Sequence, residues 1–181
     1  MIQPPELKLA LPITLSNNAV STTTAVWDIL TASKEGNLYR VRDMIDQCPE
    51  LAYAQYNYHP PIHFAVREGH TAIVKYLLSL GALDPGYTSY PFGDNLQTIA
   101  EDRRHTEIAG LLKEYLADPS RSKFNGDNGK INYKRTALQQ EFEKAVDKED
   151  IERTNQILKE HPEFSLDTTY FWSEGILTFA A

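Results

Sequence analysis

Three histidines lie close together in this sequence, and histidine is the side chain that most often binds zinc in proteins. They are His59, His63 and His70, in and next to the stretch "PPIHFAVREGH" (residues 60–70). A zinc site needs three or four converging ligands supported by further hydrogen bonds. No tight acidic companion accompanies these histidines, and Cys48 is the only cysteine of the chain. We therefore expect no metal site, and the histidines need another explanation.

The sequence also lacks the residue patterns of other catalytic and ligand-binding sites. The sequence contains no Gly-x-x-x-x-Gly-Lys or Gly-x-Gly-x-x-Gly loop for phosphates and no Gly-x-Ser-x-Gly nucleophile turn. The acidic stretch "DKEDIE" (147–152) spans an expected helix–helix turn and is interpreted as a solvated turn. The stretch "NGDNG" (125–129) is similar to a calcium loop, but it lacks the downstream glutamate and is interpreted as a hairpin turn. We expect no catalytic activity and no cofactor.

Composition and charge narrow the class of protein further. The hydrophobic content of 41% and the charged content of 24% are typical of a folded globular chain. The formal net charge of −7 argues against nucleic acid or an acidic membrane as a partner. No apolar run approaches the roughly 20 residues of a membrane span, and the first residues lack the basic start of a signal peptide. The lone Cys48 fits a reducing compartment, so we expect a cytoplasmic protein.

Two segments repeat the same residue pattern 33 positions apart. The matching pairs are Ile29 and Ile62, Ala32 and Ala65, and Gly36 and Gly69. After each glycine comes a second apolar segment, "LYRVRDMI" in one unit and "TAIVKYLL" in the other. Its apolar residues follow helical spacing, at i, i+3 and i+4. Each unit is therefore predicted to be two short helices joined by a tight turn in which glycine supplies the backbone freedom.

The unit recurs downstream. The segment "NLQTIAEDRRHTEIAGLL" (95–112) repeats the alanine and the histidine of the second unit at Ala100 and His105. The segment "FEKAVDKEDIERTNQIL" (142–158) repeats the alanine at Ala145. The ending "GILTFAA" (175–181) aligns with the start of the second unit. One helix pair cannot bury its own apolar face, so the pairs are expected to stack around a continuous core, with small alanines where helices approach closely.

These motifs resemble the ankyrin-repeat family, whose unit has a Thr-Pro-Leu-His-x-Ala-Ala first helix, a Gly-His turn and a Val-x-x-Leu-Leu second helix. The segment "PPIHFAVREGHTAIVKYLLSLGA" (60–82) matches this pattern nearly throughout. The resemblance implies an all-α repeat solenoid of stacked antiparallel helix pairs, with β-hairpin fingers between repeats. It implies that His63 hydrogen-bonds within its own turn, and it makes His70 and His105 turn histidines. It also implies a role in binding other proteins without catalysis.

We expect the following organisation along the chain. Residues 1–24 form an N-terminal cap, because Leu7 to Leu15 alternate apolar and other residues as a strand does, with Pro12 at an edge. Thr22 to Thr24 offer a cap for the first helix. Residues 25–181 form the array, with these approximate parts: repeats 25–58, 59–92 and 93–116, an insertion 117–135, a repeat 136–170 and a partial repeat 171–181.

The segments expected as fingers are rich in aromatic residues, which suit binding surfaces. The candidate partner-binding residues are Tyr56, Tyr58, Tyr87, Tyr90, Phe92 and Trp172. Aromatic rings also suit hairpins that brace one another, so bracing remains the alternative for this set.

We therefore expect a protein–protein interaction module that binds another protein, of unknown identity, through these fingers and the concave helical face. The alternative is an N-terminal targeting or regulatory region of a longer enzyme whose catalytic domain lies beyond residue 181. A related expectation is that Ala181 is not a natural end, because "GILTFAA" begins a fifth unit and stops before its turn.

Overall fold

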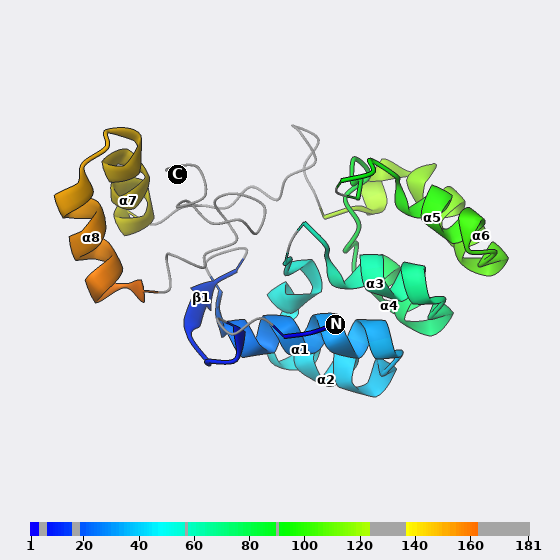
Figure 1. Ribbon diagram of the computed structural model, residues 1–181. Coiled ribbons are helices and arrows are strands. Elements are labelled where there is room, and N and C mark those ends of the chain that lie inside the picture. Colours follow the sequence, from blue (N-terminus) through cyan, green and yellow to red (C-terminus); the bar gives the residue numbers. More distant parts are fainter. Residues whose placement is uncertain (4–6, 16–18, 57, 90, 124–136, 163–181) are drawn as a thin grey trace.

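The chain folds into paired helices preceded by a short β-hairpin (Figure 1). A computed structural model describes residues 1–3, 7–15, 19–56, 58–89, 91–123 and 137–162. The elements are β1 (Pro12–Thr14), β2 (Val20–Thr22), α1 (Thr23–Glu35), α2 (Leu38–Gln47), η3 (Pro49–Tyr53), α3 (Pro61–Glu68), α4 (Thr71–Ser79), α5 (Leu96–Asp102), α6 (Thr106–Leu116), η4 (Pro119–Arg121), α7 (Ala137–Asp147) and α8 (Ile151–Glu160).

The expected helix pairs are present. Within each pair the two helices pack on one another: α1 on α2, α3 on α4, α5 on α6 and α7 on α8. Between pairs, α3 contacts both α1 and α5, while α4 contacts both α2 and α6. The pair α3–α4 therefore lies between its two neighbours, as Figure 1 shows. The first three pairs form a stack, as the repeated pattern predicts.

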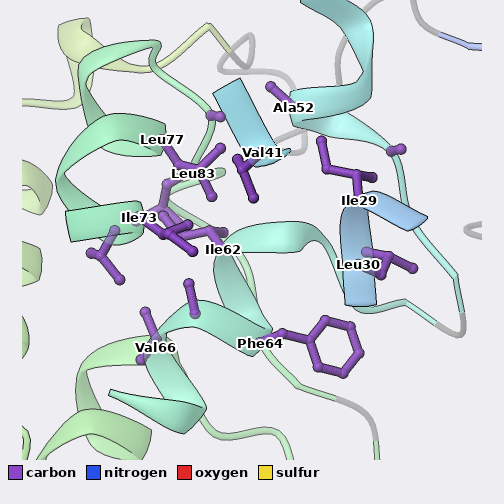
Figure 2. Close-up of a cluster of buried hydrophobic side chains, with 14 of the residues drawn as sticks. Ile29, Leu30, Val41, Ala52, Ile62, Phe64, Val66, Ile73, Leu77 and Leu83 are labelled. Atoms are coloured by element: carbon purple, nitrogen blue, oxygen red, sulfur yellow. The ribbon is translucent and has the colours of Figure 1, made fainter. Parts of the chain in front are cut away.

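One continuous core joins these three pairs. Figure 2 shows its centre, where Ile29 of α1, Val41 of α2, Ile62 of α3 and Leu77 of α4 converge, each with an exposed fraction of 0%. The repeated alanines are buried where the first helices of neighbouring pairs meet. Full burial of a branched aliphatic side chain contributes about 1.5–3 kcal/mol, so this seam supplies much of the stability of the stack. No single pair would bury these faces alone.

The turn histidines tie each pair to the one before it. Nε2 of His70 donates a hydrogen bond to the carbonyl oxygen of Lys34 at 2.7 Å. Nε2 of His105 lies 3.3 Å from the carbonyl oxygen of Arg67, at the equivalent place one repeat later. These bonds satisfy carbonyls at the ends of α1 and α3, which have no partner within their own helix. His70, one of the three histidines first considered as metal ligands, is thus a contact between repeats.

The N-terminal segment covers one end of the first pair. β1 and β2 are antiparallel, with Ile13 opposite Ser21, and Ile13 and Leu15 are buried in the core of the stack. The strand is shorter than the alternation over residues 7–15 predicts, and Leu9 remains 63% exposed. The hydroxyl of Thr22 accepts a hydrogen bond from the backbone N–H of Ala25 at 3.1 Å and caps α1, as expected.

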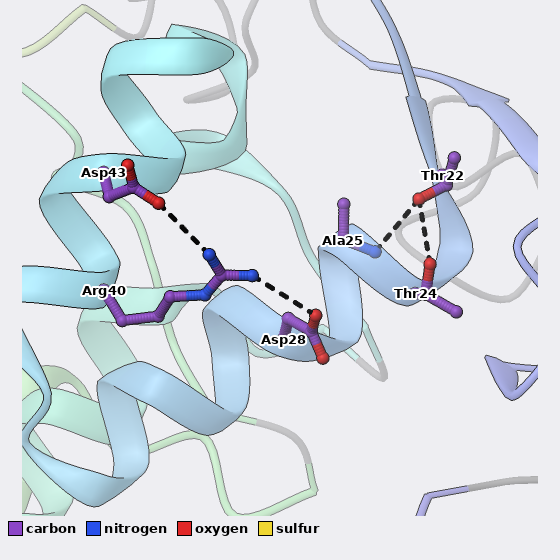
Figure 3. Close-up of polar contacts among 6 residues, drawn as sticks. All are labelled: Thr22, Thr24, Ala25, Asp28, Arg40 and Asp43. Carbon is purple, nitrogen blue, oxygen red and sulfur yellow. Dashed lines mark hydrogen bonds and ion pairs between the residues drawn. The ribbon is translucent and has the colours of Figure 1, made fainter.

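Exposed charges link the helices of the first pair. The guanidinium of Arg40 on α2 lies 3.7 Å from the carboxylate of Asp28 on α1 and 3.1 Å from that of Asp43 on α2 (Figure 3). All three side chains are about half exposed, so each ion pair contributes little to stability.

The fourth pair has a small core of its own. Phe142 of α7 and Ile157 of α8 are buried against each other and form a cluster separate from that of the first three pairs. Figure 1 shows α7 and α8 on the opposite side of the molecule from α5 and α6. The stretch "DKEDIE" forms the turn of this pair, where Asp150 caps α8 by accepting a hydrogen bond from the backbone N–H of Arg153 at 3.0 Å. Its acidic residues are exposed, as the interpretation of a solvated turn requires.

The described residues of the connections between the pairs contain little β-structure. One antiparallel bridge joins Tyr56 and His59 before α3. In the connection between α4 and α5, the described residues form turns without a strand. The described residues therefore do not show the hairpin fingers that the resemblance implies; they show one bridge and a folded loop. The expected hairpin around "NGDNG" and the partial repeat "GILTFAA" lie outside the described residues.

Candidate binding surface at the connections before α3 and α5

The connection between α4 and α5 (residues 80–95) is held in place at its start. Ala82 and Leu83 are buried in the core, with exposed fractions of 2% and 3%. The segment after η4 packs beside them: the backbone N–H of Lys123 donates to the carbonyl oxygen of Gly81 at 3.0 Å, and the Ser122 hydroxyl donates to that of Leu83 at 2.7 Å. The first residues of the insertion thus support this loop.

Backbone hydrogen bonds close the rest of the loop on itself. The N–H of Tyr87 donates to the carbonyl oxygen of Asp84 at 3.0 Å. The N–H of Ser89 donates to the carbonyl oxygen of Asp94 at 2.8 Å, and that of Gly93 donates to the carbonyl oxygen of Ser89 at 2.7 Å. A loop with internal bonds of this kind presents its side chains in a defined geometry.

A buried polar contact joins this loop to α3. The hydroxyl of Tyr87 is hydrogen-bonded to Nδ1 of His63 at 2.9 Å. The ring of His59 lies beside that of His63, with centroids 4.2 Å apart. His63 is only 4% exposed, and burial followed by the nearby charges of His59, Arg67 and Arg103 lowers its pKa to about 3. His63 is therefore neutral at physiological pH.

This contact differs from the one that the resemblance implies for His63. The hydrogen bond that the structure shows runs from α3 to the loop between α4 and α5, outside the turn of His63 itself. The sequence does not reveal it, because His63 and Tyr87 are 24 residues apart. Within the described residues, no group of three or more histidine, cysteine or acidic side chains is placed to hold a metal ion.

A hollow of about 420 Å³ opens between the two connections. Tyr58 and Pro60 line it from the connection before α3, and Leu83, Tyr87 and Pro91 line it from the connection before α5. Tyr58 has a φ of 64°, a left-handed conformation that costs free energy for a residue other than glycine. A partly apolar hollow of this size is in the range of pockets that receive ligand or partner groups.

The candidate aromatic residues have different surroundings. Tyr56 is half-buried and makes an edge contact with Trp27, with ring centroids 6.2 Å apart. Tyr87 is half-buried and bonded to His63, while Tyr58 lines the hollow. Phe92 is 83% exposed, between two residues that line the hollow. Tyr90 and Trp172 lie outside the described residues.

Asp84 is a residue of this surface that the sequence pattern did not single out. Its carboxylate is half-buried in the wall of the hollow, and Oδ1 accepts a hydrogen bond from the N–H of Gly86 at 2.8 Å. Burial raises the pKa of Asp84, and the Gly86 N–H partly offsets this effect. The run Asp84-Pro85-Gly86 is a typical turn signal, so the bend itself was predictable, but the burial of the carboxylate was not.

The paired antiparallel helices, with tight turns within the pairs and loops between them, define a mostly helical protein. Comparison with protein-family models identifies the repeat: residues 57–89 match the model described as ankyrin repeat. This segment contains α3, α4 and most of the loop that lines the hollow. The ankyrin resemblance is thus confirmed for the second unit.

A search of curated proteins finds no significant match to this chain. The ankyrin repeat is typically not catalytic, and no enzyme family was found. Among the helices of the described ranges, none is both long enough and apolar enough to cross a membrane.

Proposed function

We propose that this chain is a protein-binding module that contacts its partner through the hollow between the connections before α3 and before α5 and the adjoining concave helical face. The observation that carries the proposal is Phe92, which is 83% exposed beside a partly apolar hollow. A large ring held in water contributes nothing to the fold, but it would gain free energy when a partner buries it. The ankyrin match supports the same conclusion, since ankyrin repeats generally mediate protein binding.

The aromatic residues are assigned different roles in this proposal according to their positions at the hollow. Phe92 and Tyr58 are proposed as anchors that contact the partner, with Tyr90 and Trp172 as further candidates. Tyr56 and Tyr87 are engaged with Trp27 and His63, so their main contribution is to hold the surface in shape. A rigid surface loses less conformational entropy on binding, which favours affinity. The lone Cys48 suits a reducing, cytoplasmic setting for this function.

Site-specific photocrosslinking tests the proposal. A photoreactive phenylalanine analogue is placed at Phe92 in one version of the chain and at Tyr39 in the other. Tyr39 on α2 is 82% exposed, so the two positions are matched in ring size and exposure. In an extract of the source cells, the probe at residue 92 should capture a defined protein that the probe at residue 39 does not. The captured protein is then purified and its affinity measured directly. Capture of one protein from position 39 alone would place the binding surface elsewhere.

A further inference from the structure

The hollow beside α3 contains one charged group whose environment is unusual. The carboxylate of Asp84 is half-buried among Tyr58, Leu83 and Tyr87, and its only contact that the described residues show is the hydrogen bond from the Gly86 N–H. No ion pair to Asp84 exists within the described part of the chain. A partly desolvated carboxylate without a cation is unfavourable, and an opposite charge that arrives with a ligand relieves this cost.

The carboxylate is held in place before any ligand arrives. On one side it follows Leu83, which is 3% exposed in the core. On the other side the N–H of Tyr87 bonds the carbonyl oxygen of Asp84, and the Tyr87 hydroxyl is fixed by His63. A charge in a fixed position recognises a partner charge with little loss of conformational entropy.

The remaining wall of the hollow is mainly apolar and aromatic. Tyr58, Pro60, Leu83 and Pro91 contribute to it. This surface complements a long side chain with an apolar stem and a cationic head, because the stem can lie on the aromatic wall while the head reaches the carboxylate. The net charge of −7 adds a long-range attraction for a basic partner.

We propose that this hollow is a docking site for a basic peptide segment of a partner protein, in which an arginine or lysine side chain pairs with Asp84 and an adjacent apolar side chain fills the rest of the hollow. This inference rests on the proposed protein-binding function and adds the chemical class of the bound segment. Phe92 lies at the edge of the site and covers the apolar part of that segment.

The test uses two peptides that differ only in charge: acetyl-Gly-Leu-Arg-Gly-amide and the same peptide with citrulline in place of arginine. Citrulline has nearly the shape of arginine but no charge. Binding to the full chain is followed by NMR through the backbone amide signals of Gly86 and Tyr87. The arginine peptide should bind about five-fold more tightly than the citrulline peptide or better, and added salt should reduce this ratio.

Matched variants assign the effect to one carboxylate. Asp84→Asn keeps an oxygen for the Gly86 N–H and should reduce the affinity ratio of the two peptides to about one. Asp94→Asn makes the same change of net charge in the same loop but outside the wall of the hollow, and it should leave the ratio unchanged. Heat denaturation serves to check that both variants remain folded.

Three results would overturn the inference. They are equal binding of the two peptides, the same loss of discrimination in Asp94→Asn, and no change in the Gly86 and Tyr87 signals at millimolar peptide. None of these results bears on whether Phe92 contacts a whole partner protein, so a failure here is distinguishable from a failure of the proposed function.

Discussion

The imidazole of His70 fills the space that a side chain at Gly36 would need. A Cβ atom built on Gly36 would lie 2.7 Å from both Cε1 and Nδ1 of His70. Gly36 also has a φ of 80°, in the left-handed region. The same relationship recurs one repeat later, where a Cβ on Gly69 would lie 2.7 Å from Cε1 of His105. Each of these two turns therefore requires glycine for two reasons: its backbone is left-handed, and the histidine of the next pair occupies the space of a side chain.

Replacement of Gly36 by alanine should lower the free energy of unfolding by about 2 kcal/mol or more. The left-handed conformation costs about 1–2 kcal/mol for a residue with a Cβ, and the displacement of His70 from the Lys34 carbonyl adds to this cost. Urea denaturation followed by circular dichroism measures the change.

Two other glycines separate the cost of the left-handed backbone from the cost of displacing His70. Gly93 has a φ of 78° and nothing within 4 Å of its built Cβ, so Gly93→Ala should show the backbone cost alone. Gly110 lies within α6 with nothing within 4 Å of its built Cβ, so Gly110→Ala should raise stability by up to about 1 kcal/mol. If Gly36→Ala lowers the free energy of unfolding no more than Gly93→Ala does, His70 can move without cost and the contact between the turns contributes little.

His63 should make the protein sensitive to mild acid. Its pKa is about 3 in the folded chain and about 6.5 when unfolded, so between these values the unfolded chain binds a proton that the folded chain does not. Stability from this group is present above pH 6.5 and is lost as the pH falls, by about 2 kcal/mol between pH 7 and pH 5.

His63→Gln is the comparison for this prediction, because glutamine does not titrate and its amide oxygen can accept a hydrogen bond from Tyr87. Urea denaturation at several pH values should give a flatter pH dependence for the variant than for the natural chain. Equal slopes for the two proteins would show that His63 does not dominate the loss of stability.

The hydroxyl of Thr22 should contribute about 1 kcal/mol as the cap of α1. It accepts from the Ala25 N–H at 3.1 Å and lies 3.0 Å from the hydroxyl of Thr24 (Figure 3). Thr22→Ala removes this acceptor, and Thr22→Ser should restore most of the loss. Thr24→Ala removes only the contact between the two hydroxyls and should lower the stability by less than Thr22→Ala does. A loss from Thr24→Ala equal to that from Thr22→Ala in thermal denaturation would argue against the cap.

Arg104 should be a site where glycine stabilises the chain. It occupies the position of Gly36 and Gly69 in the third turn, and its φ is 60°. Arg104→Gly removes the steric cost of the left-handed conformation and should raise the free energy of unfolding by about 0.5–1 kcal/mol. Arg104→Ala keeps a Cβ and serves as the control, without a gain. A loss of stability in the glycine variant would show that the arginine side chain contributes more than the backbone strain costs.

Phe92→Ala should weaken binding of the partner identified by crosslinking by about 2 kcal/mol or more, because a buried aromatic anchor contributes this much. Since the ring is 83% exposed, the melting temperature should stay nearly unchanged. Tyr39→Ala removes a ring of equal exposure and should affect neither quantity. Isothermal titration calorimetry and thermal denaturation measure the two effects. A lower melting temperature with unchanged affinity would make Phe92 a brace of the fold.

The sequence by itself determined the local parts of this protein. The spacing of Ile62, Ala65 and Gly69 predicts a helix that ends at a left-handed glycine, and the structure has α3 end at Gly69 with a φ of 83°. The threonines before the first helix predict its cap. These features depend on residues within a few positions of one another, so a repeated pattern suffices to predict them.

Only the tertiary structure decided which distant residues meet. It joined His63 of α3 to Tyr87 of the loop between α4 and α5, placed His70 next to Gly36, and half-buried the carboxylate of Asp84 in the wall of a hollow. It also gave the fourth pair a core separate from that of the first three pairs, although its sequence repeats the same pattern. Such contacts follow from how closely neighbouring helix pairs pack and how the loops between them fold. These quantities depend on the shape of the whole stack, and a local pattern of apolar residues does not contain them.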